Sequence, residues 1–334
     1  MPPFSIRYFT FLSLFIGFSF SSYCQIIKGI VVDEETKEAI PFATIYFGGT
    51  YLGTSADQDG NFEIDVTQYA SMPLKISAIG YYTSTLIEHS STEKSTVYLN
   101  PKLYEINEAE IKAKSLARQR KRNLRLFRVV FIGSSANAQN CVITNEEDIT
   151  FNYGSDRDTL KAYARRPIQI ENRSLGYKVT YYLDVFEYYR HSRALYFSGE
   201  IIFDKDLYIE ELNRLYLSNR KDAYFGSRMH FFRSLWADEL KRDKYVIKDS
   251  NEISVDNDSL VHLSKYGAKY LYYPDKLLIA YHQQRFSEIS FLKEHVYFDE
   301  FGYFDPTSIS WNGDMGRFRI ADWLPYDYSV RRKK

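Results

Sequence analysis

Residues 48–64 read GGTYLGTSADQDGNFEI and place glycines and carboxylates where a ligand loop could form. A phosphate loop needs a Lys and then a Ser or Thr after its last glycine, followed by a helix, and neither feature is present here. Asp57 and Asp59, followed directly by Gly60, match only part of a calcium loop. We therefore interpret Asp59-Gly60 as the positive-φ turn of a tight hairpin, with the preceding glycine pair bending the strand before it.

Motifs for hydrolysis are missing from the sequence. None of the six histidines lies in H-E-x-x-H or H-x-x-E, which place two zinc ligands on one helix face. Ser91 and Lys94 form an S-x-x-K without its K-T-G companion, and G-x-S-x-G is absent. Asp314 and Asp322 could pair as in a glycosidase, although we favour a turn-pinning role for Asp322. We predict no catalytic residue, no metal ligand and no cofactor.

The stretch 223–243 holds the side chains that we single out as candidate ligand contacts. Its apolar residues recur at helical spacing, which predicts a helix with a buried face. His230 is interpreted as a hydrogen-bonded core histidine, with a site residue as the alternative. Arg228 and Arg233 flank it and could bind an anionic group. Three tryptophans, together with tyrosines, could stack on sugars. These tryptophans are Trp236, Trp311 and Trp323.

Composition favours a β-rich protein without a charge bias. The 334 residues include 30 tyrosines, a residue type that suits half-buried sheet positions. Lys and Arg total 43 and Asp and Glu total 43, so nothing global favours a nucleic-acid partner. A chain of this length has room for about two domains.

Residues 1–24 have the layout of a secretory signal peptide. Arg7 precedes an uncharged apolar run, and small residues stand before a cut ahead of Gln25. Cys24 lacks the small preceding residue that a lipidation signal needs. We therefore expect export to the periplasm, or association with the outer membrane or cell surface. Cys141 is then the single remaining cysteine and is interpreted as a small buried hydrophobe.

Residues 25–101 alternate short β-like runs with turns. Phe62, Ile64 and Val66 alternate with polar residues, as a strand with one buried face requires. About seven such runs follow one another at close spacing, which predicts a small all-β sandwich.

The ordered segments GIVVD, TKEAIPFA, GGTYLGT, DQDGNFEI and AIGYY resemble the carboxypeptidase-like regulatory domain. This family is a transthyretin-like β-sandwich common in exported proteins of Bacteroidota. The resemblance implies the sandwich fold and an envelope location. It implies no peptidase activity, since the domain is an accessory of carboxypeptidases and carries no catalytic residue.

Residues 102–131 are predicted to form a basic linker helix. Leu116, Leu124, Phe127 and Phe131 fall near one face, and eight cations lie between residues 112 and 128. We favour a helix docked on the following domain with a solvated charged face. The alternative is peripheral contact with an anionic membrane through residues 112–128.

Residues 132–334 read as an α+β domain of unknown function, since strand-like runs surround helical stretches between residues 204 and 243. One expected hairpin turns at Pro274-Asp275. Segments such as FIGSSANAQNCVITN and GRFRIADWLPYDY resemble parts of uncharacterised Bacteroidota proteins, a likeness that implies no activity.

Two functional hypotheses follow. The first is a non-catalytic exported binding or accessory protein of the cell envelope, with an envelope protein or glycan as partner and the oligomeric state left open. The second is a hydrolase that acts on envelope glycan or peptide, with a site near Arg228 and His230.

Overall fold

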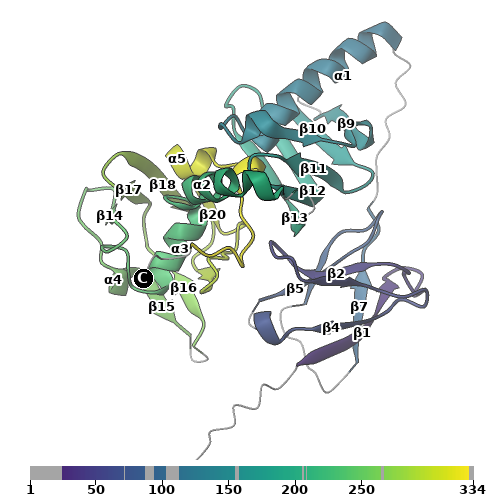
Figure 1. Cartoon of the computed structure of the whole chain (residues 1–334), viewed down its shortest axis with the longest axis horizontal. Helices are drawn as coiled ribbons and strands as arrows, with labels where there is room; N and C mark the ends of the chain where they lie inside the picture. The colour runs from purple at the N-terminus through teal and green to yellow at the C-terminus, as the bar shows by residue number, and fades with distance from the viewer. Residues whose placement is uncertain are drawn as a thin grey trace, which may run out of the picture.

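The computed structural model describes residues 25–70, 72–86, 94–102, 113–154, 158–204, 207, 209–264 and 267–330 (Figure 1). The predicted signal peptide, the first part of the linker at 103–112, and Ser91 lie outside these residues.

The described part of residues 25–101 forms two β-sheets. One sheet has the order β4-β1-β7, with β1 parallel to β7, and the other has the order β3-β2-β5-β6 with antiparallel pairs throughout. The strands are β1 (Ile26–Asp33), β2 (Thr44–Phe47), β3 (Gly53–Ser55), β4 (Asn61–Asp65), β5 (Leu74–Ser77), β6 (Ser84–Leu86) and β7 (Ser95–Leu99), with a 3₁₀ turn η1 (Thr67–Tyr69).

A single hydrophobic core joins the two sheets. Every second residue of a strand points to the same side, so the alternating runs bury one side chain in two. Ile27 and Phe62 from one sheet cluster with Ile45 and Leu74 from the other. The sequence prediction of a multi-stranded β domain followed by mixed helix and strand is confirmed.

The turn at Asp59-Gly60 differs from its predicted role in one respect. Gly60 has φ +74°, as the sequence indicated. The strands on either side, β3 and β4, belong to different sheets, so the turn carries the chain across the core and closes no hairpin. Local turn chemistry fixes the reversal of the chain but leaves open which strand pairs with which.

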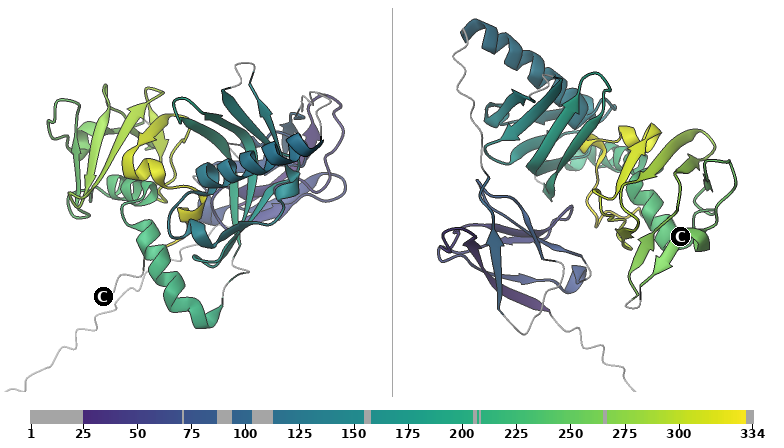
Figure 2. Two further views of the ribbon diagram at one scale, coloured as in Figure 1. Left: turned by 90° about the horizontal axis from the view of Figure 1, so that it is seen from above. Right: turned by 180° about the vertical axis from the view of Figure 1, so that it is seen from behind.

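The second unit is an antiparallel sheet with a helix across one face (Figure 2). Its sheet has the order β8-β11-β12-β10-β9, and β13 pairs along the other side of the long strand β12. The elements are α1 (Ala113–Phe127), the π-helical turn η2 (Arg128–Ile132), η3 (Ala138–Asn140), β8 (Cys141–Ile143), η4 (Glu146–Asp148), β9 (Ile149–Tyr153), β10 (Thr159–Ala164), β11 (Ile168–Asn172), β12 (Tyr177–Tyr189) and β13 (Leu195–Asp204).

The end of α1 and the following turn η2 are packed on this sheet. Phe127 and Phe131 are fully buried, and their rings lie 4.8 Å from Phe186 and 5.1 Å from Tyr181 respectively. Arg120 donates to the carbonyl of Ile149. The predicted linker helix is therefore part of the second unit, which agrees with the docked interpretation.

The remaining residues form a third unit with its own core and two elements that pack on the second unit. The third unit contains α3 (Arg228–Trp236), β14 (Tyr245–Lys248), α4 (Asn257–Leu260), β15 (Val261–Leu263), β16 (Lys269–Leu271), β17 (Leu277–Tyr281), β18 (Arg285–Phe291), β19 (Val296–Phe298), β20 (Ile309–Asn312) and α5 (Gly313–Arg317), and it follows η5 (Glu210–Leu212) and α2 (Asn213–Tyr224). The buried end of α2 and the turn η6 (Ile320–Asp322) belong to the core of the second unit. The predicted region 132–334 thus holds two separate clusters of buried residues.

The predicted hairpin at Pro274-Asp275 is wrong. β16 pairs with β15 and β19, whereas β17 pairs with β14 and β18, so the two strands beside this turn lie in different sheets. The hairpin that does form joins β17 to β18 through His282 and Gln283, both with positive φ. Positive φ at two successive residues suits a tight hairpin, but neither residue is a glycine or asparagine that would have revealed it.

The turn Gly48–Thr50 after β2 connects the first domain to the other units. The Gly49 amide donates to the carbonyl of Ile201 at 2.7 Å, and the Tyr326 amide donates to the carbonyl of Gly49 at 2.6 Å. Gly49 has φ +74°, and a Cβ there would lie 2.5 Å from the Tyr326 ring. The glycine pair therefore permits a close approach between domains, a role that the sequence alone did not indicate.

Side chains extend this contact along β12 and β13. The rings of Tyr46 and Tyr182 stack at 5.6 Å. Lys75 and Glu200 form an ion pair at 2.7 Å whose side chains are 12% and 21% exposed. The first domain is thus held against the second by both backbone and side-chain contacts.

Candidate functional site

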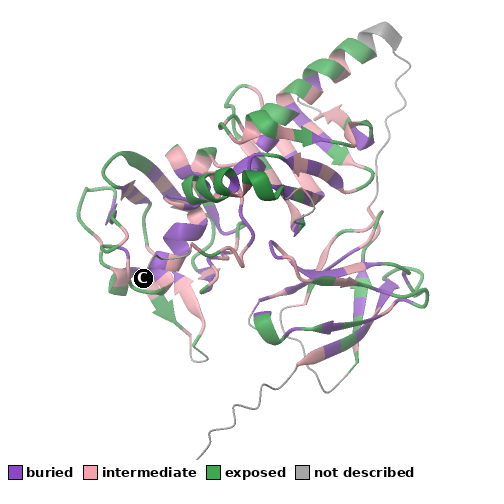
Figure 3. Cartoon of the chain, viewed as in Figure 1, coloured by how far each residue is buried: buried purple, intermediate pink, exposed green. Residues whose placement is uncertain are grey.

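The three predicted ligand contacts lie on α3, whose first turn is capped by a serine. Ser227 has extended backbone angles, and its side chain accepts from the His230 amide, as an N-cap residue does. Phe231, Phe232 and Leu235 pack into the core of the third unit, whereas Met229 belongs to the core of the second unit. Figure 3 colours most of the helix as buried. The helix thus lies within the stretch that the sequence spacing predicted to be helical.

His230 is buried in a box of aromatic rings. Its side chain accepts a hydrogen bond at Nδ1 from the Gly226 amide at 3.2 Å, and the Tyr245 hydroxyl lies 3.0 Å from the same atom. Nε2 faces Asp243 at 3.7 Å. Burial lowers the pKa of His230 to about 4, although Asp243 opposes this effect. The imidazole is therefore neutral at neutral pH and fixed by the fold.

The guanidinium of Arg228 contacts the C-terminal part of the third unit. Its Nε donates to the carbonyl of Met315 at 2.9 Å, and its guanidinium lies 5.4 Å from the centre of the Trp311 ring. Burial, and to a smaller extent Arg319, lower the pKa of Arg228 to about 9.

Arg233 ties three carbonyls together. It donates to Phe301 at 2.9 Å, to Tyr328 at 2.7 Å and to Tyr326 at 2.8 Å. The planar fork of a guanidinium makes several such bonds in fixed directions, which a lysine cannot do. Arg228, His230 and Arg233 therefore share a helix but point to different partners, and the structure does not bring them together around one opening.

Asp57 closes the loop that resembled a calcium site. Its Oδ1 accepts from the Asp59 amide at 2.9 Å and from the Asn61 amide at 2.8 Å. These bonds, led by the one to Asn61, lower the pKa of Asp57. Within the described residues, no group of three or more His, Cys, Asp or Glu side chains is placed to hold a metal ion.

Asp322 pins a turn, as the sequence suggested. Its Oδ1 accepts from Ser135 at 2.8 Å and from Asn137 at 3.0 Å, which holds the loop after η2 against η6. Asp314 has other partners, the amide of Phe286 and the side chain of Arg317.

Cys141 is a partly buried thiol. It donates to the carbonyl of Asn137, and burial raises its pKa to about 12. A thiol with a raised pKa is a poor nucleophile at neutral pH, which suits the interpretation of Cys141 as a packing residue.

The tryptophans offered for sugar stacking have internal partners. Trp323 stacks on Phe197 at 6.0 Å, and Trp236 lies under the ammonium of Lys269 at 4.4 Å. Trp311 packs beside Phe231 and Phe232. A different set of rings, brought together only in the tertiary structure, lies on the sheet of β15, β16 and β19.

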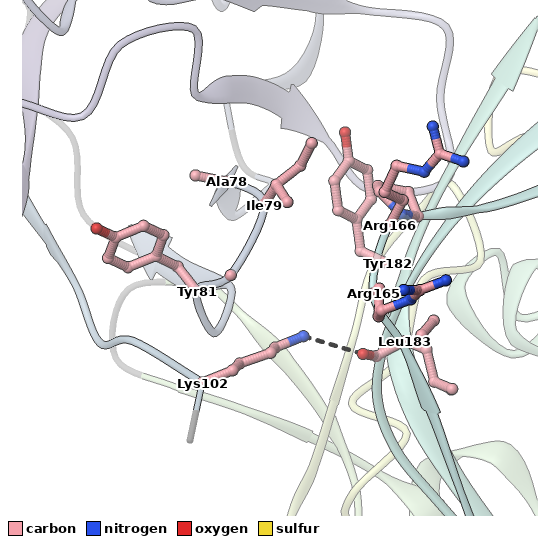
Figure 4. Close-up of a pocket in the computed structure, with 11 residues that line it drawn as sticks. Ala78, Ile79, Tyr81, Lys102, Arg165, Arg166, Tyr182 and Leu183 are labelled. Atoms are coloured by element: carbon pink, nitrogen blue, oxygen red, sulfur yellow. Dashed lines mark hydrogen bonds between the residues drawn. The ribbon is translucent and has the colours of Figure 1, made fainter. Parts of the chain in front are cut away.

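Two cavities lie away from α3. Figure 4 shows the first, between the loop that contains Tyr81 and the sheet face at Tyr182, where the Lys102 ammonium donates to the carbonyl of Leu183 at 2.9 Å. The second lies between η2 and β8 and is lined by apolar side chains and the Arg128–Glu146 ion pair. Neither cavity is lined by a predicted ligand-contact residue.

Comparison with known proteins supports the assignment of the first domain. Residues 27–111 match the model of the CarboxypepD_reg-like domain, which covers about a quarter of the chain. The predicted domain family is thereby confirmed for this part.

Other comparisons carry no functional argument. No curated protein matches the chain. One solved structure with some similarity is a 9R-lipoxygenase from Cyanothece PCC8801, at 10% identity, covering 64% of this chain and 48% of that chain, with a TM-score of 0.17. The chain thus spans about half the length of that protein, and a TM-score this low supports no inference.

Proposed function

We propose that this protein is a non-catalytic, exported accessory or binding protein of the cell envelope, built on a transthyretin-like sandwich of the kind found in Bacteroidota. The signal-like residues 1–24 and the CarboxypepD_reg-like match support it. The observation that carries the proposal is the contact between the matched domain and the rest of the chain. Its Gly48–Thr50 turn is hydrogen-bonded into the second unit, so the domain braces the rest of the chain.

The chemistry of the second and third units fits this role. His230 is neutral and enclosed, and the guanidinium of Arg233 donates to three backbone carbonyls. A substrate would have to displace the core to reach them. No specific observation in the described residues favours the hydrolase hypothesis.

The described residues contain no helix long and apolar enough to cross a membrane. A peripheral contact through α1 is a separate proposal, supported by Arg118, Lys121 and Arg125, which are exposed and have no acidic partner among the described residues. Because Phe127 and Phe131 are buried, this contact would be electrostatic. Co-sedimentation with phosphatidylglycerol vesicles should fall when salt is raised or when the three cations become Gln.

Cell fractionation of the tagged protein tests the envelope proposal, combined with cross-linking and capture of bound envelope components. We expect the protein in the envelope fraction, together with an envelope protein or glycan. Recovery in the cytoplasm with an intact N-terminus would contradict export.

A further inference from the structure

The three-stranded sheet β15-β16-β19 presents a face of aromatic rings to the outside. Register places His262 opposite Tyr270, and Tyr270 opposite Tyr297. Residues two apart on a strand share a side, so Tyr272 and His295 extend the same face. We call these five residues the aromatic face: His262, Tyr270, Tyr272, His295 and Tyr297.

The opposite side of the same sheet explains this orientation. Leu271, Val296 and Phe298 alternate with the aromatic residues and are fully buried in the core of the third unit. The apolar side of the sheet therefore packs into the core, and the rings on the other side point away from it. His262 and His295 are exposed, and the three tyrosines are partly buried. Figure 3 shows β15 and β16 at the rim of the molecule, in the colours of exposed and intermediate residues.

The rings form a continuous surface. Tyr272 lies 5.2 Å from both His262 and His295, and Tyr270 lies 6.2 Å from His295 and 5.9 Å from Tyr297. The row continues from Tyr297 to Tyr303 at 6.2 Å. An outward sheet face is normally polar, so a contiguous row of rings there needs an explanation beyond packing.

Charge around the face indicates a neutral ligand. Lys269 donates to the carbonyl of Trp236 at 2.6 Å, and Lys293 pairs with Asp305 at 3.1 Å, so both nearby described lysines are occupied. Glu294 is 76% exposed beside His295. A phosphate-bearing ligand would meet this carboxylate, and both neighbouring described lysines already have partners.

We propose that the aromatic face binds a neutral oligosaccharide, with sugar rings stacked on Tyr270 and Tyr272. Tyrosine and histidine combine an apolar ring face with a polar edge, which matches the C–H face and hydroxyl rim of a pyranose. This inference rests on the proposed binding function and identifies an envelope glycan as its ligand.

Calorimetric titration of the purified full chain tests the site with chitohexaose, cellohexaose, laminarihexaose and maltohexaose. We expect at least one to bind with little dependence on salt. Tyr272→Ala should weaken binding at least about tenfold, whereas Tyr272→Phe, which keeps the ring, should stay within about threefold. His262→Ala, on the edge strand, removes an exposed ring without touching the core and should also weaken binding. Tyr196→Ala is the matched control, since Tyr196 is a 46% exposed tyrosine on β13.

The proposal fails if none of the four sugars binds, or if binding survives both ring-removing variants. Binding of a single-stranded oligothymidine with the same ring dependence would also overturn it, in favour of nucleic acid. Circular dichroism melting confirms that each variant is folded. Because the titration uses purified protein, its failure is distinct from a failure of envelope localisation, which fractionation reports.

Discussion

Asp299 is a buried carboxyl group with one unpartnered oxygen. Its Oδ1 accepts from the amides of Phe301 and Tyr303, while Oδ2 has no hydrogen-bond partner among the described residues. Burial raises the pKa of Asp299 to about 7, against the smaller lowering effect of the two amide bonds. The native protein therefore holds a proton here that the unfolded chain loses near pH 4.

Asp299→Asn should change the pH dependence of stability. Between pH 3.8 and about 7 the folded state binds the extra proton, so rising pH destabilises the wild type, by on the order of 4 kcal/mol in total. The variant lacks this loss. Its free energy of unfolding, relative to that of the wild type, should therefore rise from near zero at pH 4 to a few kcal/mol at pH 8. Urea unfolding across this range measures it.

His230 makes the stability of the protein depend on pH in the opposite direction. Its folded pKa of about 4 lies below the unfolded value of 6.5, so stability is lost as pH falls through this window. The two effects oppose each other in the wild type, and Asp299→Asn should expose the His230 slope. Identical pH profiles for the two proteins would contradict the burial argument for Asp299.

At the scale of elements, the β2–β3 turn is a contact that only glycine allows. Gly49→Ala must accept both φ +74° and a Cβ 2.5 Å from the Tyr326 ring. We expect a loss of about 2–4 kcal/mol in the free energy of unfolding. Gly80→Ala is the control, because Gly80 has φ +87° with no atom within 4 Å of an added Cβ. Equal losses in denaturant unfolding would show that only backbone strain matters and that the turn is not tightly packed.

Arg233 fastens α3 to the C-terminal segment. Arg233→Lys keeps the charge but cannot satisfy the carbonyls of Phe301, Tyr326 and Tyr328 together. Unsatisfied buried acceptors cost about 1–3 kcal/mol each, and local rearrangement recovers part of this, so we expect a net loss of about 2–4 kcal/mol. Thermal melting compares it with Arg317→Lys, whose side chain is 84% exposed and which should be nearly neutral. Similar melting temperatures for the two variants would remove the fastening role.

At the scale of the whole molecule, the Lys75–Glu200 pair tests whether the domains form one cooperative unit. Burial raises the pKa of Glu200, while Lys75 opposes this. Lys75→Met leaves a largely enclosed carboxylate unpaired and should cost about 2–4 kcal/mol, most of it recovered in Lys75→Met/Glu200→Gln. The exposed pair Lys28–Glu63 is the control, with side chains 64% and 53% exposed, and should contribute under about 1 kcal/mol.

Unfolding should follow a single transition if this contact couples the domains. A Lys75→Met variant that melts the first domain alone, with the rest unchanged, would show the domains to be independent. The separate cores still predict that residues 102–334 fold without residues 25–101, at a lower melting temperature because β13 and Tyr326 lose their partners.

The sequence by itself determined the features that depend on near neighbours. Alternation identified the strands of the first domain, helical spacing identified α3, and Asp59-Gly60 identified a turn with positive φ. The ordered motifs identified the domain family. These signals survive in a linear reading because backbone sterics and the helix and strand periods act within a few residues.

Tertiary structure alone decided which strands pair and what faces outward. Pro274-Asp275 closes no hairpin because β16 and β17 enter different sheets, and Gly49 is fixed by the Tyr326 ring, 277 positions further along the chain. The aromatic face arises because β15, β16 and β19 align their registers, although each strand alone shows only one or two rings on that side. Pairing and register are set by burial across the whole chain, and no local pattern of residues contains that information.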